Sequence, residues 1–479
     1  MTSEVGASVV GTSEVRAVAE SVRNYSLTGP ESLRAVERGL ADADWYRSPV
    51  DPATMAALQT RTNGRAAFDT ALWIGLLVGT ALVAWTFRDS WWAIPAFAAY
   101  GMLYGGAADA RWHEFGHSTA FRSELANIIL YYPACFMLMR EPTAWRWSHV
   151  RHHSDTIIVG RDPEIVFPRP FRFGTWIGNL VGLFGVPAMI RRIVRHARGQ
   201  VDADVRSYVP ADQRHRVVLE ARVFVALLAG VMLWSALTRS IWPVVFVGLP
   251  TFYGSWLVLF FGTTQHLGLR EDVLDHRLNS RTVYMNPVFR FLYLNMNYHV
   301  EHHMYPTVPY RNLPRLHEAI RDDLPEPAPS TLAAYREIFR AARAQQSDAA
   351  FELERVVPVA PERAEPPVAE TVLGADGWAT VCPSDELGAG EVRRLDADGG
   401  TYAICRTVSG TVHAVDGICT HSRRVHLGGG AVIDCELECP KHNGRFDLAT
   451  GEPTRLPVRE PLATYEVAET GGEVRVRLR

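Results

Sequence analysis

Four apolar stretches of about 20 residues each stand out along the chain, arranged as two pairs. A helix rises 1.5 Å per residue, so about 20 apolar residues cross a bilayer core of about 30 Å. Within each pair a turn of only three residues separates the two stretches, and tryptophans gather at the ends that meet these turns, as at a membrane interface. Two hairpins this apolar in a soluble protein would need an unusually large core. We therefore expect four transmembrane helices, over Ala66–Phe87, Trp91–Ala108, Val217–Leu237 and Ile241–Phe261.

Two further apolar stretches, Leu125–Leu138 and Trp176–Ile190, are shorter and contain Pro133 and Pro187. Their length favours helices that lie at the membrane interface or inside the protein. Residues 1–60 are polar with scattered apolar positions, which indicates short cytosolic helices, one of them starting near Pro30.

The pattern changes beyond residue 345. Residues 345–370 are rich in Pro, Ala and Glu, a composition typical of linkers. From residue 371 onward, short alternating segments separated by glycine turns predict a small all-β domain. The expected organisation is an N-terminal cytosolic helical segment, an α-helical integral membrane domain, a linker and a β domain, covering residues 1–60, 61–344, 345–370 and 371–479 respectively.

The distribution of arginines along the chain predicts which ends of the four expected spans face the cytoplasm. Residues 109–216, between the two pairs, contain 15 arginines, whereas each tight turn contains only one, Arg88 or Arg239. The positive-inside rule then places both termini and the long loops in the cytoplasm, which predicts an integral protein of a bacterial inner membrane. The N-terminus has no signal-peptide pattern. A net charge of −3 gives no indication of nucleic-acid binding.

Nine histidines gather just beyond the ends of the predicted spans, on the cytoplasmic side. They form one HxxxH and two HxxHH clusters, plus a single histidine between the second and third clusters. Residues three or four apart share a helix face, and neutral imidazole is the commonest metal ligand near pH 7. The pattern predicts a centre with two metal ions, with candidate ligands His113, His117, His149, His152, His153, His266, His299, His302 and His303.

A second metal pattern lies in the β domain. Cys419 and His421 form C-x-H, and Cys439 and His442 form C-x-x-H after a gap of 17 residues. In a Rieske centre two thiolates hold one iron of a 2Fe-2S cluster and two imidazoles hold the other. The alternative is a structural zinc site, but zinc fingers pair cysteine with cysteine and histidine with histidine. Free thiolates in a chain with six cysteines favour a reducing compartment.

The β domain resembles Rieske ferredoxins over essentially its whole length. The respiratory type carries an extra disulfide at positions that Arg424 and Lys441 occupy here, so the resemblance implies the lower-potential ferredoxin subtype. We expect Cys435 to be a core residue. Arg423, Arg424, Lys441 and Arg445 flank the cluster and are candidates for a docking patch, the alternative being a solvated rim.

Residues of about 60–345 resemble the membrane fatty acid desaturase superfamily, which implies four transmembrane helices under a cytosolic cap with a histidine-ligated diiron centre. Matching the motifs carries the ligand role onto the nine histidines, with His266 as the extra ligand after the fourth span of acyl-CoA desaturases. Two departures stand out. Gly262 replaces an asparagine of those enzymes, and the first box is HxxxH instead of HxxxxH. The segments WRWSHVRHHSDTIIVGRDPE and NMNYHVEHHMYP look closer to a bacterial branch of this superfamily. That branch is associated with rhizopine breakdown.

These resemblances imply an O2-dependent non-haem diiron oxidoreductase that hydroxylates, dealkylates or desaturates an unactivated C–H position. Its own 2Fe-2S cluster would deliver the electrons, and a separate NAD(P)H-dependent ferredoxin reductase would supply them. Two alternatives stay open: a desaturase of lipid acyl chains, and a membrane-anchored Rieske electron carrier with a non-catalytic metal site. Polar residues that are candidates for a substrate pocket, or else for structural roles, are Asp155, Asp162, Asn279 and Asn297.

Overall fold

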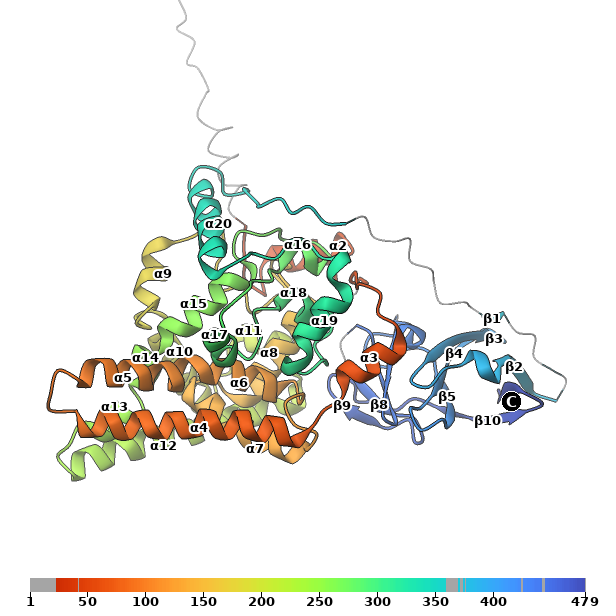
Figure 1. Cartoon of the computed structure of the whole chain (residues 1–479), viewed down its shortest axis with the longest axis horizontal. Helices are drawn as coiled ribbons and strands as arrows, with labels where there is room; N and C mark the ends of the chain where they lie inside the picture. The colour runs from red at the N-terminus through yellow and green to blue at the C-terminus, as the bar shows by residue number, and fades with distance from the viewer. Residues whose placement is uncertain are drawn as a thin grey trace, which may run out of the picture.

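A helical body and a smaller β domain lie side by side in the computed structural model of the chain (Figure 1). The structure describes residues 23–41, 43–358, 369–370, 374, 376–423, 425–441 and 444–478. Two predicted positions near the cluster, Arg424 and His442, lie outside the described residues, as do the first 22 residues of the predicted N-terminal segment.

Within these described residues, three helical segments are long and apolar enough to cross a membrane: Asn63–Thr86, Ala211–Leu237 and Trp242–His266. The first is α4, the second is mainly α12 (Arg214–Leu237), and the third combines the short helices α13 and α14 with α15 (Ser255–His266). Large apolar side chains such as Leu82 on α4 and Met232 on α12 are exposed on their surfaces. In the absence of a protein partner such side chains favour lipid as their surroundings.

The second expected span, Trp91–Ala108, has a different local structure. Here α5 (Ala93–Gly101) continues through a π-helical turn, Met102–Gly106, into α6 (Ala107–Gly116). It is not among the three membrane-length segments, so a count of four spans is not confirmed. Glycines explain the close packing of this turn. A Cβ on Gly106 would lie 2.6 Å from the Leu257 side chain, and π-helical turns often occur near functional sites.

The two shorter apolar stretches are helical. One forms α7 (Glu124–Met137), and the other contributes to α9 (Phe173–Asn179) and α10 (Gly185–Ala197). Each leaves apolar side chains exposed, for example Ile129 on α7 and Leu183 in the turn between α9 and α10. These exposed faces fit the predicted interfacial position better than a fully buried one.

Short helices build a cap at one end of the long helices (Figure 1). As the sequence predicts, α2 begins at Pro30, because proline lacks the N–H that the first turn leaves unpaired. The remaining α-helices are α2 (Pro30–Glu37), α3 (Pro52–Gln59), α8 (Pro142–Ser154), α11 (Ala203–Tyr208), α13 (Trp242–Phe246), α14 (Pro250–Tyr253), α16 (His276–Asn279), α17 (Pro287–Leu292), α18 (His299–Met304), α19 (Leu313–Ile320) and α20 (Thr331–Ala344).

The β domain consists of two sheets. The larger has the order β1-β3-β4-β5-β10-β11-β2, and the smaller has the order β6-β7-β8-β9. All pairings within them are antiparallel except β1 with β3. The strands are β1 (Ala369–Glu370), β2 (Trp378–Pro383), β3 (Val392–Ala397), β4 (Gly400–Arg406), β5 (Val412–Asp416), β6 (Ala431–Ile433), β7 (Glu436–Glu438), β8 (Arg445–Asp447), β9 (Pro453–Arg455), β10 (Thr464–Thr470) and β11 (Glu473–Arg477).

The first half of the predicted linker packs against the helical body. The Leu353 N–H donates a hydrogen bond to the Gly268 carbonyl at 2.8 Å, and the Leu353 side chain is buried. Glu352 pairs with Arg169 at 3.0 Å. Residues 345–358 therefore extend the cap, and a connection between the two domains can begin only beyond them.

Candidate metal centres and substrate cavity

The fold brings all nine predicted histidines together as two groups. In each group, one nitrogen of every ring lies within 4.8 Å of those of the others. Metal–nitrogen bonds are about 2.1 Å for zinc, so two ligands across an ion stand about 4.2 Å apart. The spacing in each group therefore suits one metal ion. The larger group contains His113, His117, His149, His153 and His302, and the smaller group contains His152, His266, His299 and His303.

Helical phase explains this division. His149 and His153 lie one turn apart on α8 and face the first group, whereas His152 is rotated toward the second. On α18 the arrangement is reversed, because His299 and His303 face the second group and His302 faces the first. Each HxxHH cluster thus contributes to both groups, which holds the two groups side by side.

The ring nitrogens fit a metal better than they fit one another. The Nε2 atom of His149 lies 3.0 Å from that of His117 and 3.1 Å from that of His153, and a single neutral nitrogen cannot satisfy both as donor and acceptor. In the second group, the Nε2 atoms of His299 and His303 lie 3.0 Å apart. Both nitrogens of buried His113 have no hydrogen-bond partner within the described part of the chain. Such buried unpaired groups are costly, and a metal ion in each group would satisfy them.

Hydrogen bonds on the outer side of the rings fix the orientation of several histidines. His149 Nδ1 lies 3.1 Å from Glu164, and His152 Nδ1 lies 2.9 Å from Asp162. His266 Nδ1 lies 2.8 Å from the Asn279 carbonyl oxygen. A partner that accepts the Nδ1 proton leaves Nε2 free to bind a metal, as is usual for ligating histidines.

The surroundings keep most of these rings neutral. Burial, followed by the neighbouring histidines, lowers the pKa of His113, His153 and His302 well below the usual value. Burial alone would also lower the pKa of His152, but Asp162 outweighs it and the pKa is raised. Neutral imidazole is the form that binds a metal, so the electrostatics of the first group favour metal binding.

A tenth histidine, His276, lies beside the second group and was not predicted from the sequence. The His276 ring centroid lies 5.1 Å from that of His303, and its ring stacks on Trp45 at 4.2 Å. It belongs to no HxxxH or HxxHH cluster, so spacing gave no signal. Glu164 was missed as a partner of His149 for a similar reason, because carboxylates that support a metal ligand follow no fixed spacing.

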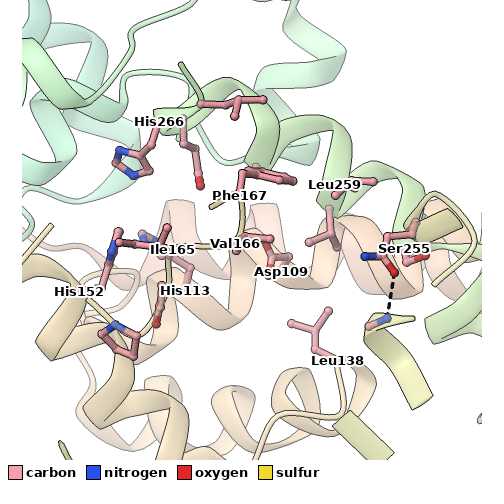
Figure 2. Close-up of a pocket in the computed structure, with 18 of the residues that line it drawn as sticks. Asp109, His113, Leu138, His152, Ile165, Val166, Phe167, Ser255, Leu259 and His266 are labelled. Atoms are coloured by element: carbon pink, nitrogen blue, oxygen red, sulfur yellow. Dashed lines mark hydrogen bonds between the residues drawn. The ribbon is translucent and has the colours of Figure 1, made fainter. Parts of the chain in front are cut away.

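A cavity of about 370 Å³ extends from the histidines into the helical body. Figure 2 shows His113, His152 and His266 at one end, Asp109 near the middle, and Leu259 and Ser255 toward the other end. Apolar side chains such as Leu138 and Phe167 form much of the wall. We name this space the substrate cavity.

The four polar residues predicted for a substrate pocket are all buried, but none lines the substrate cavity. Asp155 pairs with Arg161 at 3.2 Å, and Asp162 orients His152. Asn279 donates to the Thr156 carbonyl oxygen at 3.1 Å, and Asn297 donates to the Val283 carbonyl oxygen at 2.8 Å. Their contacts are therefore structural or support the metal ligands.

A second cavity, of about 640 Å³, lies on the other side of the histidines, between the helical body and the β domain. His153 and His303, one from each group, line it together with Pro440 and Lys441 of the β domain. Its wall also contains the charged residues Asp44, Arg47, Glu391, Arg394 and Glu438. We name this space the interdomain cavity.

The predicted Rieske cysteines are close to each other in the β domain. Cys419 and Cys439 are both buried, and a hydrogen bond from Cys439 lowers the pKa of Cys419. His421 is exposed, and His442, as stated, lies outside the described residues. Cys435, expected in the core, is exposed. It occupies the tight turn between β6 and β7, whose short strands leave the turn at the surface.

The β domain touches the helical body through the segment Arg455–Arg459. The Arg455 guanidinium donates to the carbonyl oxygen of His117 at 2.6 Å. Leu456 packs against a hydrophobic cluster that includes Trp147, and Arg459 pairs with Asp212 at 2.8 Å. We name residues 455–459 the docking segment.

The residues of the predicted docking patch differ in their surroundings. Lys441 lines the interdomain cavity, Arg424 lies outside the described residues, and Arg423 and Arg445 form ion pairs within the β domain. Arg445 is buried and pairs with Glu438 at 2.9 Å inside the β domain, so it is not available at the surface. Arg423 is exposed and pairs with Glu460. The hydrogen bond and ion pair to the helical body described above come from the docking segment, which begins at the last residue of β9, and β6 also lies against α3.

Comparison with known proteins agrees with both parts of this architecture. The fatty acid desaturase family profile matches residues 89–332, and the profile of the Rieske [2Fe-2S] domain matches residues 377–466. The ferredoxin component of the p-cumate 2,3-dioxygenase system of Pseudomonas putida is 32% identical over 94 residues, covering 20% of this chain and 80% of that protein.

Other ferredoxins give similar matches. The ferredoxin component of the naphthalene 1,2-dioxygenase system of Pseudomonas aeruginosa is 33% identical over 101 residues, covering 21% of this chain and 95% of that protein. Among solved structures, the ferredoxin of carbazole 1,9a-dioxygenase from Nocardioides aromaticivorans IC177 is 34% identical, with a TM-score of 0.20, covering 21% of this chain and 98% of that chain.

The cofactors follow from these families and from the two histidine groups. A Rieske domain holds a 2Fe-2S cluster, and the desaturase family holds two irons with clustered histidines, as the geometry here allows. The family implies an oxidoreductase, for which O2 is a consistent co-substrate. The chain belongs to the fatty acid desaturase family and carries a Rieske [2Fe-2S] domain at its C-terminal end.

Proposed function

We propose that this protein is a membrane-bound diiron oxygenase that uses O2 to oxidise an unactivated C–H bond of a small amphipathic molecule. Its own Rieske cluster delivers the electrons. The product is an alcohol, a dealkylated compound or an alkene. The observation that carries the proposal is the convergence of nine histidines into two metal-sized groups at the end of the substrate cavity.

In this proposal each histidine group holds one iron. His113, His117, His149, His153 and His302 form the first ligand set, and His152, His266, His299 and His303 form the second. When bound, the two irons supply O2 activation and the oxidising power for C–H cleavage. Glu164 and Asp162 keep their histidines in the ligating orientation, because each faces the Nδ1 atom of its ring.

The walls of the substrate cavity place the reacting carbon and limit water. Histidines of both groups, including His113 and His299, line its inner end. Apolar side chains such as Ile157 and Phe167 surround the same space. Excluding water protects a reactive centre from side reactions, and holding the substrate in one orientation selects the carbon that is oxidised.

The docking segment supports electron delivery within one chain. Arg455 connects the β domain directly to His117, a proposed ligand. Glu438, the residue before Cys439, lies 3.9 Å from the same arginine. A fused donor also has an effective concentration of the order of mM for a short tether. An NAD(P)H-dependent ferredoxin reductase would supply the cluster.

The size of the substrate cavity favours a small substrate over a long acyl chain. Ligand pockets in proteins span about 300–1,000 Å³, so a cavity of about 370 Å³ lies near the lower end of this range. Acyl-chain desaturation is the second candidate, favoured by the family itself.

Product analysis with 18O2 tests the proposal. The holoenzyme in lipid nanodiscs, with a ferredoxin reductase and NADH, would be given candidate substrates of about 8–12 heavy atoms and fatty acyl substrates. Incorporation of 18O into a small product supports the oxygenase. An alkene formed only from long acyl substrates supports the lipid desaturase. No product, with only two irons per chain, would leave an electron carrier as the explanation.

The proposed orientation places the β domain in the cytoplasm of a bacterium, as the arginine distribution predicts. Cys435 offers a direct test, because it is exposed whereas the other five cysteines are buried. A membrane-impermeant thiol reagent should label Cys435 in inside-out vesicles but not in intact spheroplasts. Labelling in intact spheroplasts would reverse the orientation, and Cys435→Ser provides the control for specificity.

A further inference from the structure

Two arginine–carboxylate ion pairs of the described residues line the substrate cavity, Arg169–Glu271 and Asp109–Arg140. Arg169 and Glu271 also bond to Tyr25, whereas Asp109 and Arg140 pair with each other. Asp109 is on α6 and Arg140 is in the loop between α7 and α8, and the guanidinium donates to the carboxylate at 2.5 Å. Their side chains are 22% and 18% exposed, so both are largely withdrawn from water yet reach the cavity. Ionisable groups placed near a membrane core are costly and commonly belong to functional sites.

The guanidinium is held in a fixed plane. Its carbon lies 4.6 Å from the Trp112 ring centroid and 4.5 Å from that of Trp145. The two indoles are nearly perpendicular, at 84°, with centroids 6.0 Å apart. Met139, the residue before Arg140, has a positive φ of 55°, so the backbone is in the left-handed region just before Arg140. Such contacts with aromatic rings restrict a guanidinium to donating within its plane.

The pair retains hydrogen-bonding capacity after its internal bond is made. A guanidinium has five N–H donors, and among the residues that the structure describes the Arg140 side chain forms one hydrogen bond, to Oδ1 of Asp109. Oδ2 of Asp109 accepts no hydrogen bond from any residue that the structure describes. A donor and an acceptor are therefore presented side by side to the cavity, while the net charge of the pair is zero.

We propose that the Asp109–Arg140 pair recognises a neutral group that both donates and accepts hydrogen bonds, namely a hydroxyl or an amide, on a substrate whose remaining part is apolar. A carboxylate or an ammonium would compete with one partner of the pair and leave the other uncompensated in a poorly hydrated site, which is costly. A hydroxyl satisfies both without separating them. This inference rests on the proposed function and names its substrate class.

The position of the pair also fixes which carbon reacts. Trp112 precedes His113 in sequence, and its ring lies 5.6 Å from that of His149. Asp109 lies about one helical turn from His113 on α6. The polar group is thus anchored between the metal end and the space lined by Val258, Leu259 and Met189, which takes the apolar part. We expect oxidation close to the polar group, within a few bonds, and not at the far end of the apolar part.

The experiment measures equilibrium binding without turnover. Radiolabelled 1-octanol, octanamide, octanoate and octylammonium would be dialysed against the metal-loaded holoenzyme in nanodiscs under anaerobic conditions, with empty nanodiscs as the blank. We expect the alcohol and the amide to bind at least about ten-fold more tightly than either ion, because an ion leaves one charged partner of the pair without its hydrogen bond.

Two variants should invert this preference in opposite directions. Asp109→Asn leaves the arginine uncompensated and should make octanoate the preferred ligand. Arg140→Met leaves the aspartate uncompensated and should favour octylammonium. Arg140→Lys keeps the charge, so it should still favour the neutral ligands. The matched control, Asp89→Asn, makes the same chemical change in an ion pair of a surface turn and should leave the order unchanged.

The results separate this inference from the proposed function. Equal binding of all four probes to the wild type, or an unchanged order in Asp109→Asn, overturns the assignment of the pair even if the enzyme oxidises substrates. The expected inversion supports it even if no product is ever formed. If Arg140→Met does not fold, the Asp109→Asn and Arg140→Lys results decide on their own.

Discussion

The two cavities that reach the histidines differ in size, lining and neighbours. The substrate cavity, of about 370 Å³, enters the helical body and has many apolar side chains in its wall, together with its histidine end and the ion pairs Asp109–Arg140 and Arg169–Glu271. The interdomain cavity, of about 640 Å³, borders the β domain and has charged residues such as Arg394 and Lys441 in its wall. The comparison suggests a division of tasks, with substrate on one side of the metals and electrons arriving from the other.

The largest expected effect comes from removing a proposed metal ligand, because both substrate oxidation and electron uptake require the metal centre. His302→Ala should abolish O2-dependent turnover and reduce the non-cluster iron, while the visible absorption of the Rieske cluster persists. His302 faces the first group and its Nε2 lies 3.2 Å from that of His153. Iron analysis and absorption spectra provide the measurement. His215→Ala, at an exposed histidine, is the control, and loss of the Rieske absorption in His302→Ala would mean that the two centres are not independent.

Cys419→Ser should abolish electron delivery and leave the histidine centre and the substrate cavity unaffected. The variant should keep its histidine-bound iron and its binding of substrate but lose turnover driven by NAD(P)H and reductase. The reason is that a serine replaces one of the two thiolates that hold the cluster iron. Iron analysis, equilibrium binding and turnover would be measured together. Normal reductase-driven turnover in this variant would exclude the cluster as the internal donor.

Changes in the docking segment should slow electron delivery without affecting substrate affinity. Leu456→Asp places a charge in the hydrophobic cluster around Trp147, and Arg455→Ala removes the hydrogen bond to His117. We expect each to slow cluster reoxidation by roughly ten-fold or more, as loss of a charged hydrogen bond allows. Stopped-flow spectroscopy measures the rate. Arg477→Ala, at an exposed arginine on β11, should have no effect, and an equal effect there would refute the assigned docking segment.

Narrowing the substrate cavity should have the smallest effect and only on the substrate side. Leu259→Trp adds volume to its wall, so KM for the longest accepted substrate should rise by roughly ten-fold, while cluster reoxidation stays unchanged. Steady-state kinetics over a series of chain lengths provides the measurement. Leu233→Trp, at an exposed position on α12, is the matched control. A change in the electron-transfer rate would contradict the separation of the two sides.

The sequence was most informative where metal binding requires a fixed spacing between the ligand residues. Residues three or four apart on a helix must share a face, so the HxxxH and HxxHH clusters could be recognised, and the structure brings all nine histidines together. Their division into two groups could not be predicted, because it depends on how α6, α8, α15 and α18 are rotated against one another. The Rieske pattern was similarly recognisable, and the family profile confirms it.

Interactions between distant parts of the chain were the least predictable. Arg445 was a candidate for docking because it lies near the cluster in sequence, but its guanidinium pairs with Glu438 on the adjacent strand. Asp162 and Asn279 were candidates for the pocket because they are polar and follow the histidine clusters, and they support histidines instead. Asp109 and Arg140 are 31 positions apart, so only the fold reveals that they form one feature of the cavity.

The most direct test of the account is Mössbauer spectroscopy of holoenzyme enriched in 57Fe, before and after anaerobic reduction through the ferredoxin reductase. The account predicts about four irons per chain, half of them in a Rieske spectrum and half in a separate nitrogen-ligated site, with the second half reduced only after the cluster and reoxidised by O2. A spectrum that contains only the Rieske irons, or a second site that the cluster does not reduce, would contradict it.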